Sequence, residues 1–467
     1  MNLVFAMILS IVIKGVSAIV EIAIQMLITN SVGVSEYGTY TFFVSLIEGA
    51  YFLLFSGSVK LNTFYLSSYS AKLSQFKKNY LKYYVFPIIT IIILSFAFMN
   101  NVYGIVAGVI LFIYYIAFDM SSVFFSRGNQ LPALVGEYLL GRIVLLIAMI
   151  TVVKLEVTSS IVLLSLYGIQ FVVMIVWFLM QKRKIVYGNE EVIVSLKKLA
   201  EYQVSDVANS LISYSPTILQ YILGGAFSAG FIGIISIVKR FINFISGPTA
   251  KVFLPEFSRL YKNNQREKLE QSYLMIVRVQ MIFIGTIASI LVGFPKLVLN
   301  LFSPELVKYS FTFTCTAFSL LIVSGIGPVT GMLQMTGNER KCNKNQWFSI
   351  LSMVIVMILF RKREMFAVYG LCVQAIVEAC MKYYSVCKWF KKNIIPIKNY
   401  IYMWLPVCLV CFVVFLFGLQ FSFISLILFT IFVFIWNVII TSQDTMIQSV
   451  IKEKKILKTT NERRLND

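Results

Sequence analysis

The sequence predicts an all-α membrane protein with about fourteen transmembrane helices and no sizeable soluble domain. Apolar stretches of about 20 residues recur along the chain, and an α-helix needs this length to cross the hydrocarbon core of a bilayer. Of the 467 residues, 58% are hydrophobic and only 13% are charged, and the mean hydropathy is +0.82. Alternating segments of about ten residues, typical of an outer-membrane barrel, do not recur. Helices satisfy their own backbone hydrogen bonds in lipid, so the helical class is favoured.

Long apolar runs predict the individual helices, and the eleventh run is the shortest. In order along the chain, the expected helices are Leu3 to Ile28, Tyr40 to Gly57, Tyr83 to Met99, Val102 to Val123, Ala133 to Val153, Ser159 to Met180, Val204 to Leu223, Ala229 to Thr249, Tyr273 to Phe294, Tyr309 to Met335, Trp347 to Phe360, Phe366 to Cys387, Tyr402 to Gly418 and Phe421 to Thr441. The connections between them are short. They leave no room for an extramembrane catalytic domain.

The distribution of Lys and Arg predicts the orientation. Loops on the side of the C-terminus carry 29 of the 41 basic residues, against six in the opposite loops. Cytoplasmic loops carry the excess of positive charge in membrane proteins, so both termini are expected in the cytoplasm. Arg361, Lys362 and Arg363 fall on the outer side in this arrangement. A re-entrant or shifted eleventh helix would restore the rule there.

Composition also excludes several classes of function. The net charge of +20 follows the membrane loops, so it does not indicate a nucleic-acid partner. The chain has no histidine, which excludes imidazole catalysis and His-ligated metals. Cys408 and Cys411 form a CxxC, but they lie in an apolar helix without acidic neighbours and are expected to pack. We therefore expect no enzymatic activity, no cofactor and no metal site.

Two glycine turns indicate an internal repeat. Gly33 to Gly38 follows the first helix and Gly225 to Gly230 follows the seventh, and each is a G-x4-G turn before an apolar helix. The turns lie 192 residues, or six helices, apart. Because six is even, the two copies would be parallel, related by an axis along the membrane normal. A transport path is then expected between the halves.

The repeat divides the chain into four predicted parts. These are an N-terminal six-helix bundle at 1–200, a C-terminal six-helix bundle at 201–400, accessory helices thirteen and fourteen at 401–441, and a basic cytoplasmic tail at 442–467. The accessory helices contain no ionisable residue, so we expect them to pack in lipid. The segments 60–82, 181–200 and 452–467 are basic and polar, and we expect them near anionic headgroups.

Ionisable residues inside the helices are the strongest indication of a site, because each costs several kcal/mol in lipid unless it is paired or wetted. The basic members are Lys14, Arg142, Lys239, Arg240, Arg278 and Lys382, and the acidic members are Glu21, Glu48, Asp119, Glu137, Asp206 and Glu378. This balance indicates a polar interior with ion pairs rather than a single proton-relay acid.

Polar stripes mark two helices at equivalent places in the halves. The first helix carries Lys14, Ser17, Glu21 and Gln25, and the seventh carries Asp206, Asn209, Ser213, Thr217 and Gln220, with Pro216 expected to bend it. The eighth helix adds Ser236, Lys239, Arg240 and Asn243. Such stripes are expected to face a cavity.

Two interpretations of these charges remain open. Glu137, Glu378 and Lys382 suit structural ion pairs, and the last two are four residues apart on one helix. Central cations can instead bind a phosphate-bearing substrate, and the candidates are Lys14, Arg142, Lys239, Arg240 and Arg278. Candidates for polar cavity lining or ion coupling are Glu21, Gln25, Glu48, Asp119, Asp206, Asn209, Ser213 and Asn243.

Three short segments carry a resemblance to a known family. They are NSVGVSEYGTY at 30–40, FLPEFSRLY at 253–261 and LQMTGNERK at 333–341. In this order on fourteen helices, they resemble the multidrug/oligosaccharidyl-lipid/polysaccharide (MOP) exporter superfamily, and within it the Wzx-like O-antigen and capsule repeat-unit flippases. The resemblance spans nearly the whole chain.

The resemblance implies two six-helix bundles around a central cavity in the bacterial plasma membrane. It implies that the substrate is an undecaprenyl-diphosphate-linked oligosaccharide, moved from the inner to the outer leaflet by alternating access. It further implies coupling to H+ or Na+, which Glu21 or Asp206 would serve, and a polysaccharide polymerase and chain-length regulator as candidate partners. Family motifs do not fix substrate contacts, so the site residues above rest on the stripes.

Other functions remain alternatives. A multidrug/cation antiporter of the same superfamily would favour an anionic cavity, against the six buried cations here. A peptidoglycan-precursor flippase would share the fold and the cationic cavity. A membrane glycosyltransferase or polymerase usually has long outer loops, which this chain lacks, and a channel would show a repeated filter sequence.

Overall fold

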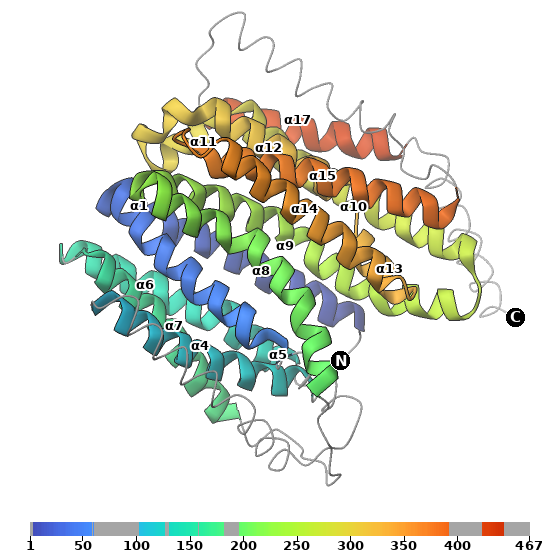
Figure 1. Ribbon diagram of the computed structural model, residues 1–467, viewed down its shortest axis with the longest axis horizontal. Helices are drawn as coiled ribbons and strands as arrows, with labels where there is room; N and C mark the ends of the chain where they lie inside the picture. The colour runs from blue at the N-terminus through green and yellow to red at the C-terminus, as the bar shows by residue number, and fades with distance from the viewer. Residues whose placement is uncertain are drawn as a thin grey trace, which may run out of the picture. The chain divides into compact units, whose positions relative to one another are not determined.

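The computed structural model describes residues 3–57, 59, 102–126, 130–156, 158–181, 196–391 and 423–442 (Figure 1). Within these ranges all regular elements are helices, which confirms the predicted all-α class. The expected helices at 83–99 and 402–418 lie outside the described residues, as do the inner loop 60–82, most of the segment 181–200, the Cys408–Cys411 pair and the basic tail.

The other twelve expected helices all correspond to helical segments. Their bounds are α1 Leu3–Leu54, α4 Val102–Ser126, α5 Gln130–Leu134, a π-helix Val135–Leu140, α6 Gly141–Lys154, α7 Ser160–Gln181, α8 Leu196–Gly224, α9 Ala226–Lys262, α10 Arg266–Gly293, α11 Pro295–Phe302, a 3-10 helix Pro304–Tyr309, α12 Ser310–Gly325, α13 Val329–Met335, α14 Glu339–Leu359, α15 Phe366–Phe390 and α17 Phe423–Ser442.

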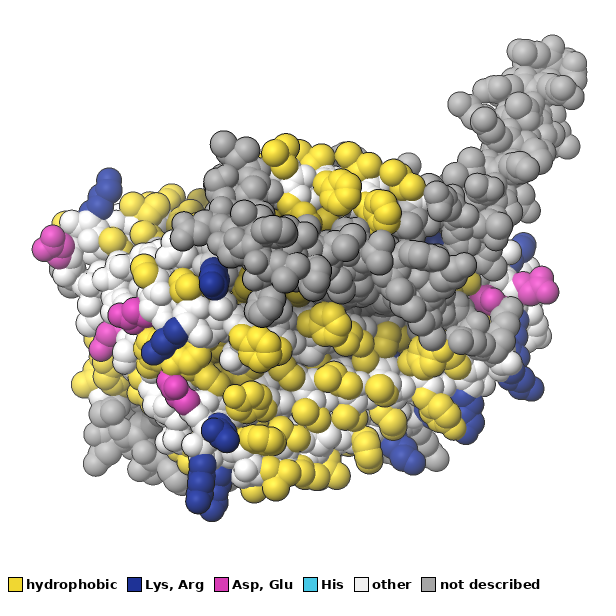
Figure 2. Space-filling model, turned by 90° about the horizontal axis from the view of Figure 1, so that it is seen from above, with side chains coloured by type: hydrophobic (Ala, Val, Ile, Leu, Met, Phe, Trp, Pro, Cys, Tyr) yellow, Lys and Arg dark blue, Asp and Glu magenta, His cyan; other side chains and the backbone are white. Residues whose placement is uncertain are grey.

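Seven helices in the described ranges are long and apolar enough to cross a membrane, and a shorter apolar helix covers Leu426–Ile439. The seven are Val12–Leu54, Val102–Phe125, Leu131–Lys154, Ser160–Gln181, Arg266–Gly293, Lys341–Leu359 and Phe366–Phe390. Hydrophobic side chains cover much of the surface seen in Figure 2. The chain is therefore a multi-pass membrane protein.

Helix α1 contains both of the first two expected helices, joined by a bend. Its 43-residue apolar part would be about 65 Å long if straight, roughly twice the thickness of the hydrocarbon core. Gly33 interrupts it with φ 82° and ψ 166°, a backbone conformation that is essentially restricted to glycine. The chain therefore turns at one residue, and not over the longer loop that the sequence predicted.

The seventh, ninth and eleventh expected helices begin earlier than predicted, at Leu196, Arg266 and Glu339. Three others differ in their interior or at their C-terminal end. The fifth contains a six-residue π-helix, Val135–Leu140, which inserts a wider turn. The eighth continues past its apolar run to Lys262, through a polar segment that is also helical. The tenth is interrupted at residues 326–328, where Gly327 has φ 87° and a proline follows.

The chain forms two compact units. The first comprises residues 1–240, 301–303 and 350–371, and the second comprises 241–300, 304–349 and 372–467. In the first, α1 packs against α4, α6, α7 and α8. In the second, α10 packs against α12 and α17, and Phe257 and Tyr273 lie in a buried core. The division into parts at residues 200, 400 and 441 stays a prediction.

The two predicted glycine turns meet within the first unit. Gly33 and Gly225 both have positive φ, 82° and 87°. Gly38 and Gly230 lie against each other's turn, and a Cβ added to either would come within 3.0 Å of backbone atoms on the other side. The turns that marked the sequence repeat are therefore also neighbours in space.

Candidate functional site

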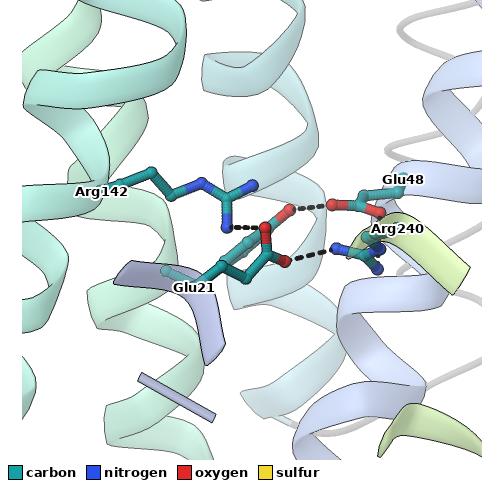
Figure 3. Close-up of polar contacts among 5 residues, drawn as sticks. Glu21, Glu48, Arg142 and Arg240 are labelled. Carbon is teal, nitrogen blue, oxygen red and sulfur yellow. Dashed lines mark hydrogen bonds and ion pairs between the residues drawn. The ribbon is translucent and has the colours of Figure 1, made fainter. Parts of the chain in front are cut away.

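Two carboxylates and two guanidinium groups form an ion-pair cluster in the first unit (Figure 3). Glu21 accepts from both arginines: its Oε2 lies 2.6 Å from a terminal nitrogen of Arg142, and its Oε1 lies 2.8 Å from one of Arg240. Arg240 also lies 3.5 Å from Glu48. The side chains of Glu21 and Glu48 are 11% and 9% exposed, so the two carboxylates are largely buried, whereas the arginines are partly exposed. Its four formal charges cancel.

Three helices bring this cluster together, and a fourth adds a tyrosine. Glu21 and Glu48 lie on α1 on either side of its bend, while Arg142 lies on α6 and Arg240 on α9. Tyr167 on α7 donates its hydroxyl to Oε1 of Glu48 at 2.7 Å. A continuous polar chain therefore runs from α7 through α1 and α9 to α6.

The π-helix orients the residues that precede Arg142. Glu137 accepts a hydrogen bond from Ser121 at 2.7 Å. The Lys14 ammonium lies 4.7 Å from the ring centre of Tyr138, a cation–π distance. A π-helix adds a residue to the turn and so rotates the residues that follow it. It therefore sets the direction in which the Arg142 side chain points from the start of α6.

A small cavity adjoins the cluster. Its volume is about 20 Å³, room for roughly one water molecule. The lining is rich in hydroxyl, amide and guanidinium groups, and consists of Glu21, Ile24, Gln25, Tyr37, Tyr40, Thr41, Val44, Ser45, Arg142, Leu145, Tyr167, Thr217, Gly233, Ser236, Ile237 and Arg240. Two buried atoms in it, Oε1 of Gln25 and the Tyr37 hydroxyl oxygen, have no hydrogen-bond partner among the described residues.

The lining chemistry suits an anionic, hydroxyl-rich ligand. Two guanidinium groups bind phosphate or carboxylate oxygens through paired, charge-assisted bonds. The uncommitted Gln25 and Tyr37 groups can bond to ligand hydroxyls. In the conformation described, however, the arginines are occupied by Glu21 and Glu48 and the cavity is nearly closed. A larger ligand requires the helices to move and the internal ion pairs to exchange.

The cavity contains part of the set predicted from the sequence. Of the five candidate cations, Arg142 and Arg240 line it, as do Glu21 and Gln25 of the first polar stripe. Thr217 of the second stripe and Ser236 of the eighth helix also line it. Glu48 joins through its ion pair with Arg240. These residues therefore line one cavity, and their roles in binding or coupling stay predictions.

The remaining candidates lie elsewhere, and their roles stay predictions. In the first unit, the residues outside the lining are Lys14, Asp119, Asp206, Asn209, Ser213 and Lys239. Arg278 lies in the second unit, on α10, and Asn243 lies in a stretch of α9 whose side chains are not described. Glu378 and Lys382 form the expected pair within one helix, at 2.6 Å.

The tyrosines of the cavity were not predicted. Tyr37, Tyr40 and Tyr167 are each buried, and each lies in or beside an apolar run. Their rings pack like other aromatic side chains, and Tyr40 and Tyr167 are in edge contact at 6.3 Å. The usable signal was weak: buried Tyr hydroxyls normally require a polar partner, so a tyrosine in a membrane helix indicates a polar neighbour.

Three solved structures of a flippase and two transporters are similar in fold to this chain. The structure of the lipid II flippase MurJ in an inward closed conformation is similar, with a TM-score of 0.71 at 15% identity over 94% of this chain and 100% of that one. A MATE multidrug transporter has a TM-score of 0.58 at 15% identity, covering 84% of this chain and 96% of that one. A MOP superfamily transporter from Pyrococcus furiosus has a TM-score of 0.57 at 12% identity, covering 83% and 95%.

No protein-family model matches the sequence, and no curated protein does. The structural likenesses have low identity, so they establish the fold and leave the substrate open. The three likenesses cover between 83% and 94% of this chain. The chain has the fold of the MOP exporter superfamily.

Proposed function

We propose that the protein is a flippase for lipid-linked oligosaccharides. Its substrate would be an undecaprenyl-diphosphate-linked repeat unit of O-antigen or capsule, moved from the inner to the outer leaflet of the bacterial plasma membrane. The observation that carries this proposal is the cavity lined by Arg142 and Arg240 together with hydroxyl and amide groups. A diphosphate suits the guanidinium groups, and the attached sugars suit the others.

Alternating access fits the ion-pair arrangement. Glu21 and Glu48 pair with the arginines and neutralise a charge cluster that would otherwise be costly in a membrane. A diphosphate would replace these carboxylates. Glu21 would then lack a cationic partner, and uptake of H+ or Na+ by it would provide the coupling. Both termini would lie in the cytoplasm, and a polymerase and a chain-length regulator would act on the product.

A lipid II flippase is the second candidate function. The structural likeness to the lipid II flippase MurJ favours it, because that match has a TM-score of 0.71. The two substrates share a lipid diphosphate and differ in the attached sugar. The guanidinium groups would bind the diphosphate in both, so they do not distinguish the two substrates. The likeness to MATE multidrug transporters favours a third function, drug export, but a pair of arginines at the cavity opposes cationic drugs.

Reconstitution distinguishes these functions. The purified protein is placed in liposomes with three substrates in turn: a labelled undecaprenyl-diphosphate oligosaccharide, labelled lipid II and a fluorescent cationic drug. We expect transfer of the first between leaflets, above protein-free liposomes. Transfer of lipid II alone would support the second function. Movement of the drug alone, or no protein-dependent movement of either lipid, would contradict the proposal.

A further inference from the structure

Two buried polar groups of the cavity have no partner within the described part of the protein. Gln25 is 8% exposed and Tyr37 is fully buried, and neither Oε1 of the first nor the hydroxyl oxygen of the second makes a hydrogen bond to a described residue. Both residues line the cavity. Buried polar groups are almost always bonded to protein or to a bound molecule, because an unbonded group loses its hydration without replacement. The pair therefore indicates a bound molecule at this point.

The bend of α1 brings the two groups to one cavity. Gln25 precedes the bend at Gly33, and Tyr37 follows it. Gln25 also lies one turn of helix after Glu21, about 5.4 Å along the helix axis. Because Glu21 pairs with both arginines of the cavity, Gln25 lies next to the place where a diphosphate would bind. Gln25 and Tyr37 can therefore contact a group that is attached to this diphosphate.

The chemistry of the two groups selects a hydroxyl. An amide oxygen only accepts hydrogen bonds, so the molecule that bonds to Oε1 of Gln25 must donate one. A phosphate oxygen without a proton cannot donate, and an ammonium group would add a positive charge beside Arg142 and Arg240. The neighbouring Thr41 hydroxyl donates to the backbone carbonyl of Tyr37 at 2.6 Å, so its proton is not available to Gln25. A neutral hydroxyl or a water molecule can donate to Gln25 and accept from Tyr37 at the same time.

We propose that Gln25 and Tyr37 form a hydroxyl-binding subsite. One water molecule, the amount that the cavity of about 20 Å³ admits, bonds to both groups in the conformation described. One hydroxyl of the sugar attached to the diphosphate replaces this water when the substrate binds. The two arginines then bind the diphosphate, whereas Gln25 and Tyr37 determine which sugar is accepted next to it. The assignment of the hydroxyl to a sugar rests on the proposed function, but the binding of a shared water does not.

A double-variant cycle on the protein without substrate tests the shared water. Gln25→Met and Tyr37→Phe each keep the approximate shape of the side chain and remove its polar atoms. Each should lower the Tm in detergent, because the water loses a bond and the remaining group loses its partner. The double variant should lower the Tm by less than the sum of the two, since neither polar group is then left without a bond. The control cycle pairs Gln25→Met with Tyr273→Phe, and it should be additive because the Tyr273 hydroxyl donates to the carbonyl of Ile326 in the second unit.

Two results would overturn the shared water. An unchanged or higher Tm in Tyr37→Phe would show that this hydroxyl binds nothing, because removing an unbonded buried hydroxyl costs no hydrogen bond. Additive losses for Gln25→Met and Tyr37→Phe would show that the two groups bind separate molecules.

Transfer of defined lipids between the leaflets of liposomes tests the assignment to a sugar hydroxyl. The probes are labelled undecaprenyl-diphosphate glucose and its 2-deoxy and 3-deoxy analogues, which share the diphosphate and each lack one hydroxyl near it. In the wild type we expect one analogue to move at least about tenfold more slowly than the glucose lipid, which is the effect of one hydrogen bond to a buried group. Tyr37→Phe and Gln25→Met should slow the glucose lipid to the rate of that analogue and leave the analogue unaffected.

The outcomes separate this inference from the proposed function. Equal rates for the three lipids in the wild type, or a rate difference that persists in both variants, would overturn the assignment to a sugar hydroxyl and leave the proposed function in place. No transfer of any lipid by the wild type would contradict the proposed function and the sugar assignment together. The Tm cycle contains no lipid-linked sugar, so it would still decide whether Gln25 and Tyr37 share a bound water.

Discussion

Removing the charge of Glu21 should destabilise the protein while improving its affinity for anions. In Glu21→Gln, Arg142 loses the carboxylate at 2.6 Å, and Arg240 keeps only the 3.5 Å contact with Glu48. Breaking a buried ion pair costs about 3–5 kcal/mol, and an exposed pair contributes about 0.2–1 kcal/mol. The Arg142 and Arg240 side chains are 24% and 40% exposed. We therefore expect a loss of about 2–4 kcal/mol.

Thermal unfolding of the purified protein in detergent measures this loss. The Tm of Glu21→Gln should fall clearly below that of the wild type, whereas Glu305→Gln, in an exposed position, should change stability by less than about 0.5 kcal/mol. Adding Arg142→Gln to Glu21→Gln should cost less than the sum of the single changes, because the unpaired cation is removed. Equal Tm values for Glu21→Gln and Glu305→Gln, with additive double-variant effects, would refute the ion-pair account.

The same variant carries a second expectation of opposite sign. In the wild type, pyrophosphate must displace a carboxylate from Arg142 and Arg240 before it binds. Glu21→Gln removes this competitor, so pyrophosphate should bind more tightly and raise the Tm by a larger increment than in the wild type. A weaker response to pyrophosphate in Glu21→Gln would show that Glu21 does not compete for the arginines.

Three further substitutions test neighbouring contacts through the Tm. Tyr167→Phe removes the hydroxyl that donates to Glu48 and should cost about 1.5–3 kcal/mol, so an unchanged Tm would contradict this bond. Gly38→Ala forces a methyl group against the backbone of Ala226 and should cost about 1–3 kcal/mol. The control Gly49→Ala, on the same helix, meets only ordinary contacts and should be neutral or stabilising. Equal effects of the two substitutions would contradict the close contact of Gly38 with the Ala226 backbone. Gln203→Ala removes three hydrogen bonds to the end of α1 and should cost about 2–4 kcal/mol. A loss below about 0.5 kcal/mol, the size typical of a surface substitution, would contradict these bonds.

Hydropathy predicted the helices well because lipid leaves few alternatives for an apolar backbone. Apolar runs located all twelve of the expected helices that fall within described ranges. The ends were less accurate where a helix extends past its apolar part, as α9 does to Lys262. The π-helix before Arg142 could not be predicted either, since its hydrophobic pattern does not differ from that of an α-helix.

Part of the candidate site was predictable from the sequence, but the contacts among its residues were not. The pair of Glu378 with Lys382 followed from a spacing of four residues on one helix. Arg240 and Glu21 are 219 positions apart, and no local spacing identifies them as partners. What the sequence did indicate was the cost of each buried charge, which predicted that partners exist. Which charges meet depends on how the helices pack.

Transfer of the lipid-linked oligosaccharide by a variant that lacks the two cavity arginines tests the central claim most directly. The labelled undecaprenyl-diphosphate oligosaccharide is followed in liposomes containing wild-type protein, the double variant Arg142→Gln with Arg240→Gln, or the matched double variant Arg361→Gln with Arg363→Gln. The last two arginines are exposed in the turn after α14 and lie outside the cavity. We predict transfer by the wild type and the matched variant, and loss of transfer in the cavity variant. Undiminished transfer by a folded cavity variant would contradict the claim that these two arginines bind the substrate.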